Sequence, residues 1–236
     1  MIADTPVLSA QNLTKTYGST TALDGVSATV RAGESVAVMG ASGSGKTTLL
    51  HCLAGIVLPD TGSVRLFGTA TGVPAEITSL DDAARSALRR TEFGFVFQQG
   101  LLIPELTAGE NVALALMLNG TPRQVAEQQA AAALAALGLG GMEGRRIGEL
   151  SGGQAQRVAI ARAQVNGARV LFADEPTGAL DSRTSADVMA LLLQSVAGTG
   201  RALVVVTHDP EVARWCSRVL TLADGRIVAD TAGVAR

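Results

Sequence analysis

The residues best suited to chemistry lie near the start of the 236-residue chain, in a glycine-rich stretch between two apolar runs. The stretch reads Gly40-Ala41-Ser42-Gly43-Ser44-Gly45-Lys46-Thr47-Thr48. Glycines let successive backbone N–H groups point into one concavity, and the start of a helix adds positive potential. A strand, a glycine-rich turn and a helix in this order predict a phosphate-binding P-loop. Lys46 would then reach the β- and γ-phosphates, and the Thr47 hydroxyl is placed to ligate Mg²⁺.

Two carboxylates, Asp174 and Glu175, follow a second apolar run at residues 170–173. A buried strand here would deliver Asp174 to the carboxyl edge of the sheet, beside the P-loop, where an aspartate holds Mg²⁺. Glu175 suits a general base that polarises the attacking water. The simpler alternatives are an acidic turn after a strand and, for residues 40–48, a glycine-rich turn with no ligand.

Composition limits the classes of protein. Apolar residues make up 47% of the chain, which indicates a packed core, and the net charge of −2 gives no electrostatic footprint for nucleic acid. No apolar run approaches the roughly 18 residues of a membrane span. Residues 1–6 lack the regions of a signal peptide, so we expect a cytoplasmic chain. Cys52 and Cys216 show no metal spacing and are expected as apolar fillers, and His51 as a structural residue.

Alternating strand and helix patterns predict a mostly parallel sheet flanked by helices. The strands are expected at residues 7–13, 26–31, 35–39, 62–67, 93–97, 170–173, 202–206, 219–223 and 226–228. The helices are expected at residues 80–90, 107–118, 122–137, 184–196 and 210–215, with one more, capped by Ser151, that ends near Gln164. The alanine-rich part up to about residue 149 is expected as a helical insertion. The apolar loop 101–104 is either core-facing or a surface for a partner.

A third motif, Leu150-Ser151-Gly152-Gly153-Gln154, lies between the P-loop and the acidic strand. It resembles the signature motif of ABC-type ATPases, and the resemblance extends over roughly residues 7–230. Ala155 departs from the polar or basic residue usual in that family. The resemblance implies an α/β P-loop NTPase of ABC ATPase type, a single domain over 1–236. Its mostly parallel core sheet and antiparallel β subdomain would comprise 1–98 and 165–236, and its helical subdomain about 99–164.

The resemblance also implies ATP and Mg²⁺ as cofactors and a role for each matching residue. The signature residues, Gln154 included, would close on the γ-phosphate of ATP bound to the opposite subunit. Tyr17 would stack on adenine, and Asp181 would face the partner subunit. The implied catalytic residues are Lys46, Gln98, Glu175 and His208, and the implied metal ligands are Thr47, Gln98 and Asp174. Gln99 is a second choice for the glutamine that links nucleotide to a membrane partner.

Three stretches, 80–90, 106–112 and 175–181, are similar to the macrolide- and lipoprotein-exporter ATPases of MacB/LolD/FtsE type. That similarity implies an ATP-hydrolysing subunit, expected as a homodimer, on the cytoplasmic side of the membrane. It would power an integral-membrane permease of FtsX/MacB-like architecture. The alternative is an FtsE-like regulatory ATPase that transmits force to a cell-wall enzyme and moves no solute. Soluble ABC ATPases of DNA repair or translation fit less well, because the chain has no long coiled coil, no second cassette and no basic patch.

Overall fold

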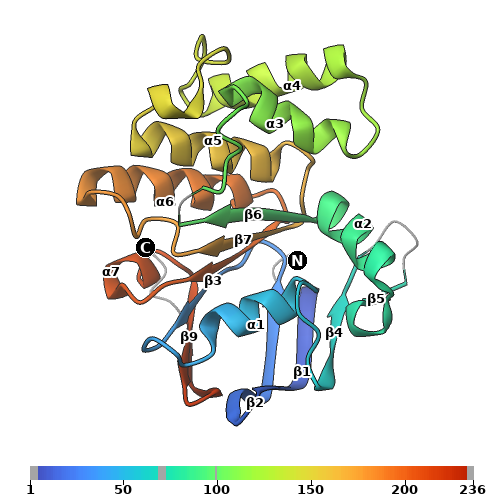
Figure 1. The fold of residues 1–236 in the computed structure, drawn as a ribbon. Helices are drawn as coiled ribbons and strands as arrows, with labels where there is room; N and C mark the ends of the chain where they lie inside the picture. Colours follow the sequence, from blue (N-terminus) through green and yellow to red (C-terminus); the bar gives the residue numbers. More distant parts are fainter. Residues whose placement is uncertain (1–4, 69–72, 99, 233–236) are drawn as a thin grey trace. The chain divides into compact units, whose positions relative to one another are not determined.

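The computed structural model describes residues 5–68, 73–98 and 100–232, which form two compact units (Figure 1). The first unit comprises residues 1–89 and 196–236, and the second comprises residues 90–195. Gln99, the second choice for the coupling glutamine, lies outside the described residues. No helix among the described residues is long and apolar enough to cross a membrane.

The first unit contains an antiparallel sheet and a set of mostly parallel strands. The antiparallel sheet has the order β2-β1-β4-β5, with bounds β1 Pro6–Tyr17, β2 Thr20–Arg31, β4 Thr61–Leu66 and β5 Ala75–Glu76. The second set has the order β10-β9-β3-β8, with bounds β3 Ser35–Met39, β8 Ala202–Val206, β9 Arg218–Ala223 and β10 Arg226–Ala232. Strand β3 pairs in parallel with both β8 and β9. The helices are α1 Lys46–Leu53, η1 Ile77–Ser79, α2 Asp82–Glu92, whose last three residues fall in the second unit, and α7 Pro210–Ala213.

The parallel strands are short, apolar and buried on both faces. All five side chains of β8, which reads ALVVV, are buried, as are the first four of β3. Valine suits such strands because its branched side chain packs well on a pleated surface. The Cys52 and Cys216 side chains are also buried, and burial raises the pKa of the Cys52 thiol to about 11 and that of Cys216 to about 12. Both cysteines are therefore apolar fillers, as expected.

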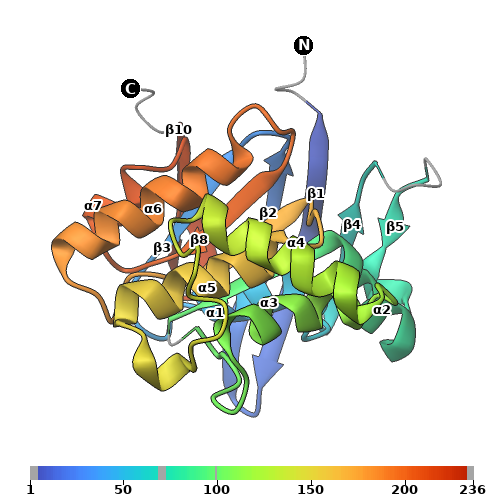
Figure 2. The same cartoon turned by 90° about the horizontal axis from the view of Figure 1, so that it is seen from above.

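The second unit joins one parallel strand pair to a group of helices. Its strands are β6 Phe93–Phe97 and β7 Val170–Asp174. Its helices are α3 Ala108–Met117, α4 Arg123–Ala136, η2 Ile147–Glu149, α5 Gly152–Gln164 and α6 Ser182–Val196, whose last residue falls in the first unit. Helices α3, α4 and α5 lie side by side (Figure 2). Small buried residues such as Ala113, Ala130 and Ala161 let them approach closely around Leu134 and Val158.

Most expected elements are present, with ends that shift by at most four residues, except that β2 begins six residues earlier than expected. Strands 35–39, 93–97 and 202–206 begin and end where the sequence predicts. The longest deviations are in β1 and β2, which extend through to the turn at Gly18, and in β10, which runs to Ala232. The two-residue strand β5 and the short η1 turn were not predicted, because neither is long enough to show a periodicity.

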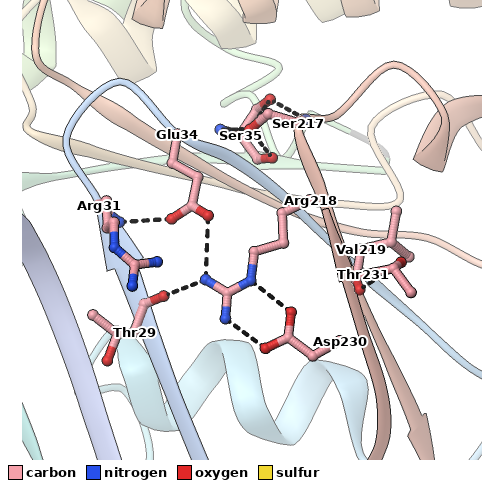
Figure 3. Close-up of polar contacts among 9 residues, drawn as sticks. All are labelled: Thr29, Arg31, Glu34, Ser35, Ser217, Arg218, Val219, Asp230 and Thr231. Atoms are coloured by element: carbon pink, nitrogen blue, oxygen red, sulfur yellow. Dashed lines mark hydrogen bonds and ion pairs between the residues drawn. The ribbon is translucent and has the colours of Figure 1, made fainter. Parts of the chain in front are cut away.

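One guanidinium joins four segments of the first unit (Figure 3). The Arg218 Nε and Nη2 atoms donate to the two carboxylate oxygens of Asp230, each at 2.7 Å. Its Nη1 donates to the Thr29 carbonyl at 2.7 Å and to Glu34 at 3.2 Å. The Arg218 side chain is only 15% exposed, so removing it would leave partly desolvated carboxylates without their cation. The hydrogen bonds from Arg218 lower the pKa of Asp230.

We predict that Arg218→Met lowers the free energy of unfolding by about 1–3 kcal/mol at neutral pH, because hydrogen bonds to charged groups are lost. The Arg218–Asp230 pair stabilises the fold above the pKa of Asp230 in the unfolded chain, and this contribution is lost as the pH falls through the lower pKa of the folded state. Urea unfolding should therefore show that the difference in unfolding free energy from wild type shrinks as the pH falls below about 4, the usual pKa of an aspartate in an unfolded chain. Arg226→Met, which breaks the exposed pair with Asp24, is the control and should cost less than about 1 kcal/mol. Equal losses for the two variants would contradict this role of Arg218.

Candidate functional site

The phosphate-binding turn joins β3 to α1 and is shaped by glycines that no other residue can replace without strain. Gly40, Gly43 and Gly45 have φ values of 154°, 79° and 101°. A Cβ on Gly40 would lie 2.3 Å from the Leu222 carbonyl oxygen, and a Cβ on Gly45 would lie 2.1 Å from the Ala22 carbonyl oxygen. The backbone thus passes close to neighbouring strands at both ends of the turn, so its shape is fixed before any ligand binds.

Lys46 begins α1 and its side chain folds back over the turn. Its Nζ donates to the carbonyl oxygens of Gly40 at 2.8 Å and Ala41 at 2.7 Å. Although only 9% of Lys46 is exposed, an ammonium group has three donors, so one remains for an anion. The Ser44 hydroxyl in the same turn is buried without a hydrogen-bond partner among the described residues. Such an orphaned donor fits a turn whose ligand brings acceptor oxygens.

The rest of the predicted turn lies around these two residues. Ala41, Ser42 and Gly43 are exposed at its tip, and Thr47 is exposed in the first turn of α1, with Thr48 half-buried behind it. The first turn of α1 carries no acidic side chain that would oppose an anion. The arrangement can therefore receive phosphate oxygens, and it leaves the Thr47 hydroxyl accessible to a cation bound to them.

His208 follows the strand beside the phosphate-binding turn. In the parallel pair of β3 and β8, Val38 lies opposite Val206, and the Thr207 N–H donates to the Val38 carbonyl oxygen at 3.1 Å. His208 therefore leaves the sheet at the same edge as Gly40, because parallel strands end at a common edge. The imidazole is exposed. The structure thus brings His208, for which the family resemblance implies a catalytic role, to the same edge as the P-loop within the first unit.

Tyr17 ends β1 and is half exposed, at 50%. The Lys15 ammonium lies 5.5 Å from the centre of its ring and donates to Asp60 at 2.8 Å. Asp60 also accepts from the Thr16 N–H at 2.7 Å, so the segment that carries the ring is fixed from two sides. The hydrogen bond to Asp60 raises the pKa of Lys15, which keeps the ammonium charged beside the ring. An exposed, oriented aromatic ring of this kind can stack on a flat base.

The second unit brings three of the predicted residues to the carboxyl ends of one strand pair. Phe97 lies opposite Asp174 in the parallel pairing of β6 and β7, so Gln98 and Glu175 both follow the last paired rung. Asp174 and Glu175 are half-buried, and Gln98 is exposed. This gathering of one amide and two carboxylates was predicted from the sequence.

Two features of this edge were not predicted. Glu175 adopts φ +47°, a left-handed conformation that is uncommon for a residue other than glycine and is often found at functional sites. A Cβ on Gly178 would lie 2.8 Å from Gln98 Nε2, so glycine at this position lets the Gln98 side chain rest against the backbone. Gly178 is visible in the sequence and could have indicated that another group approaches its backbone closely. Nothing in the sequence indicates the left-handed conformation of Glu175.

The signature residues form the N-terminus of α5. Ser151 Oγ accepts from the Gln154 N–H at 3.3 Å, and Gln154 Oε1 accepts from the Ser151 N–H at 2.9 Å, which completes a capping box. The cap occupies the Ser151 oxygen as an acceptor and leaves its O–H hydrogen as a donor. Ser151 and Gly152 are exposed, so this helix end can meet an anion from outside the chain.

Asp181 lies beside the signature residues and caps the next helix, α6. Its carboxylate accepts from the Thr184 N–H at 3.0 Å and the Thr184 hydroxyl at 2.7 Å, and these bonds lower its pKa. A Cβ on Gly153 would lie 2.5 Å from Thr184 Cγ2, so the starts of α5 and α6 are in contact. The structure therefore assigns Asp181 a local capping role that the sequence analysis did not include.

We predict that Gly45→Ala destabilises the fold more than Gly43→Ala, although both glycines have a positive φ. Gly43 has no atom within 4 Å of an added Cβ, so its substitution costs only the left-handed conformation, about 1–2 kcal/mol. Gly45→Ala adds a collision with backbone, worth at least about 1 kcal/mol more. Thermal unfolding of the two variants measures the difference. Equal melting temperatures would show that the turn is looser than described.

Comparisons with known proteins agree with this geometry. Residues 23–178 match the ABC transporter family. The chain is 43% identical over 233 residues to the pyoverdine export ATP-binding/permease protein PvdT of Pseudomonas fluorescens, a match that covers 97% of this chain and 34% of that protein. It is 50% identical over 198 residues to the macrolide export ATP-binding/permease protein MacB 1/2 of Paracoccus denitrificans, which covers 84% and 29% respectively. The chain thus spans about a third of the length of these relatives.

A solved structure shares the fold over almost the whole chain. The dimeric ATP-binding cassette MJ0796, in a post-hydrolysis state bound to ADP and Pi, superposes with a TM-score of 0.85 at 38% identity and covers 97% of this chain and 100% of that one. The expected α/β fold of ABC ATPase type is thereby confirmed, and so is the resemblance to the MacB-type group. The chain belongs to the ABC transporter family and is an ATPase cassette of that family.

Proposed function

We propose that two copies of this cassette bind ATP between them and use its hydrolysis to power a membrane permease of MacB type. The observation that carries the proposal is the pairing, in one chain, of a preformed phosphate-binding turn with an exposed serine-glycine helix end. The phosphate-binding turn would hold the triphosphate that is bound to its own chain. The serine-glycine helix end would complete the nucleotide site of the partner copy. The dimeric cassette MJ0796 supports this arrangement, and the names of MacB and PvdT support export.

In the nucleotide site the first unit would grip the triphosphate. Lys46 would offer its remaining donor to the β- and γ-phosphates, and Ser44 and the backbone of the turn would complete the cradle. Tyr17 would stack on the adenine ring. His208, which leaves the sheet at the same edge as the turn, would stabilise charge on the γ-phosphate.

Hydrolysis would depend on the residues at the ends of β6 and β7. Glu175 would accept a proton from the water that attacks the γ-phosphorus, while the bond to the leaving ADP oxygen breaks. Asp174 and Gln98, with Thr47 of the first unit, are oxygen donors of the type that Mg²⁺ prefers, although no three His, Cys, Asp or Glu side chains cluster as a metal site among the described residues. When bound, Mg²⁺ would neutralise charge that develops on the phosphate oxygens.

The loop after β6 offers a docking surface for the permease. The core-facing alternative for this loop holds for one residue, and the docking alternative is the one proposed for the residues on either side of it. Leu102 packs against the helical core, whereas Leu101 is 59% exposed and Ile103 is 38% exposed. Leu118, at the end of α3, is 60% exposed as well. These apolar side chains fit the proposed contact with a permease helix at the cytoplasmic face of the membrane.

We predict that Glu175→Gln binds ATP with wild-type affinity and hydrolyses it at least about a hundredfold more slowly, because the amide cannot accept the proton from water. ATP-bound dimer should accumulate and be detectable by size-exclusion chromatography with light scattering. Glu127→Gln, which removes an exposed carboxylate on α4, is the matched control and should turn over normally. Wild-type turnover in Glu175→Gln would remove Glu175 as the general base and the proposed mechanism with it.

A further inference from the structure

We propose that Gln156 is a positioning residue for ATP hydrolysis, because its side chain holds the backbone next to both Gln98 and Glu175. The inference rests on the catalytic roles proposed above for those two residues. Gln156 itself is not proposed to contact the nucleotide or the attacking water. It acts through the polypeptide segments to which it is bound.

The Gln156 side chain is one of the few buried polar groups among the described residues, with only 4% of the residue exposed. Its Nε2 donates two hydrogen bonds, to the Phe97 carbonyl oxygen at 3.1 Å and to the Pro176 carbonyl oxygen at 2.8 Å. A primary amide has two N–H hydrogens, so these bonds use its full donor capacity. A buried amide with both donors engaged specifies the distance between its two acceptors.

Those acceptors lie where the strand pairing ends. Phe97 and Asp174 form the last rung of β6 and β7, and within the described residues no further rung joins the two strands. The Phe97 carbonyl belongs to the peptide group that leads to Gln98. The Pro176 carbonyl lies one residue after Glu175. Gln156 therefore connects the two backbone segments where strand pairing has ended, next to Gln98 and the proposed general base Glu175.

The conformation of Glu175 needs such support. A left-handed residue other than glycine costs on the order of 1–3 kcal/mol and persists only when its surroundings determine it. The Glu175 carbonyl oxygen accepts from the Gly178 N–H at 3.1 Å, and the Pro176 carbonyl is held by Gln156. These two bonds fix the peptide groups that follow the base, so its carboxylate leaves the backbone in one direction.

The same helix carries the signature residues. Gln156 lies one turn after the Ser151 cap of α5, and Arg162, further along, donates to the carbonyl oxygens of Gly100 at 2.7 Å and Leu101 at 2.8 Å. Because a helix moves as a rigid rod over this length, a displacement of its serine-glycine end would move Phe97, Pro176 and the loop at residues 100–101 with it. Gln156 thus provides a direct mechanical link from the signature residues to the catalytic edge within one chain.

The test is Gln156→Met, which keeps the length of the side chain and removes both donors. We expect kcat for ATP hydrolysis to fall about tenfold or more, while the Kd for a non-hydrolysable ATP analogue stays within about twofold, since the phosphate-binding turn is untouched. Gln164→Met on the same helix is the matched control, because the Gln164 Nε2 has no hydrogen-bond partner among the described residues. It should leave both values unchanged. If Gln156→Met does not unfold cooperatively, Gln156→Asn, which keeps an amide but ends one methylene short, takes its place.

A double-mutant cycle with Gln98→Ala separates positioning from general damage to the fold. If Gln156 acts through the segment that carries Gln98, its substitution should cost much less in the Gln98→Ala background than in wild type. A folded Gln156 variant with kcat within about twofold of wild type would overturn the inference, and losses that multiply in the double mutant would overturn the part of it that concerns Gln98. Its failure is distinct from that of the proposed general base, which Glu175→Gln tests by itself.

Discussion

The backbone of the phosphate-binding turn runs so close to its neighbours that a side chain at either end would collide with a carbonyl oxygen. Gly40 and Gly45 meet this constraint because they have no side chain. The turn between them is also held by the hydrogen bonds from Lys46 Nζ to its first two carbonyl oxygens, and it is anchored by β3 before it and α1 after it. The phosphate-binding edge of the first unit depends on this turn. The parallel pairing of β3 with β8 places His208 at the same edge, and the turn needs no rearrangement before it receives phosphate oxygens.

In the second unit, the site residues Gln98 and Glu175 lie beyond the end of a strand pair, where the strand pairing no longer holds the backbone. Backbone pairing fixes Phe97 and Asp174, and the Gln156 and Arg162 side chains of α5 hold the segments that continue past them. The capping box at Ser151 anchors the start of the same helix. The helix that carries the signature residues is thus hydrogen-bonded to the segments that carry Gln98 and the proposed general base.

The sequence predicted the elements and the site residues that depend on local pattern. Strands such as 202–206 are apolar throughout, and Ser151 is a preferred N-cap residue before a helical run, so periodicity and capping preference were sufficient there. It did not predict contacts between residues far apart in the chain. The bonds from Gln156 to Phe97 and Pro176 span 59 and 20 residues, and the left-handed conformation of Glu175 is imposed by its surroundings. The proposed division into subdomains at 98 and 165, and the role of each site residue in ATP binding, remain predictions.

The central claim is that each ATP is held by the lysine of one copy and the serine-glycine helix end of the other. Mixing two inactive variants tests it most directly. Lys46→Ala removes the lysine and keeps the signature residues. Gly152→Asp places a negative charge at the helix end, where an added Cβ meets only Leu180 Cδ2 at 3.5 Å, and keeps the lysine. Mixed dimers would then contain one intact shared site, so we expect the mixture to regain a substantial part of the wild-type ATPase rate. A mixture that forms dimers and stays as inactive as either variant alone would contradict the claim.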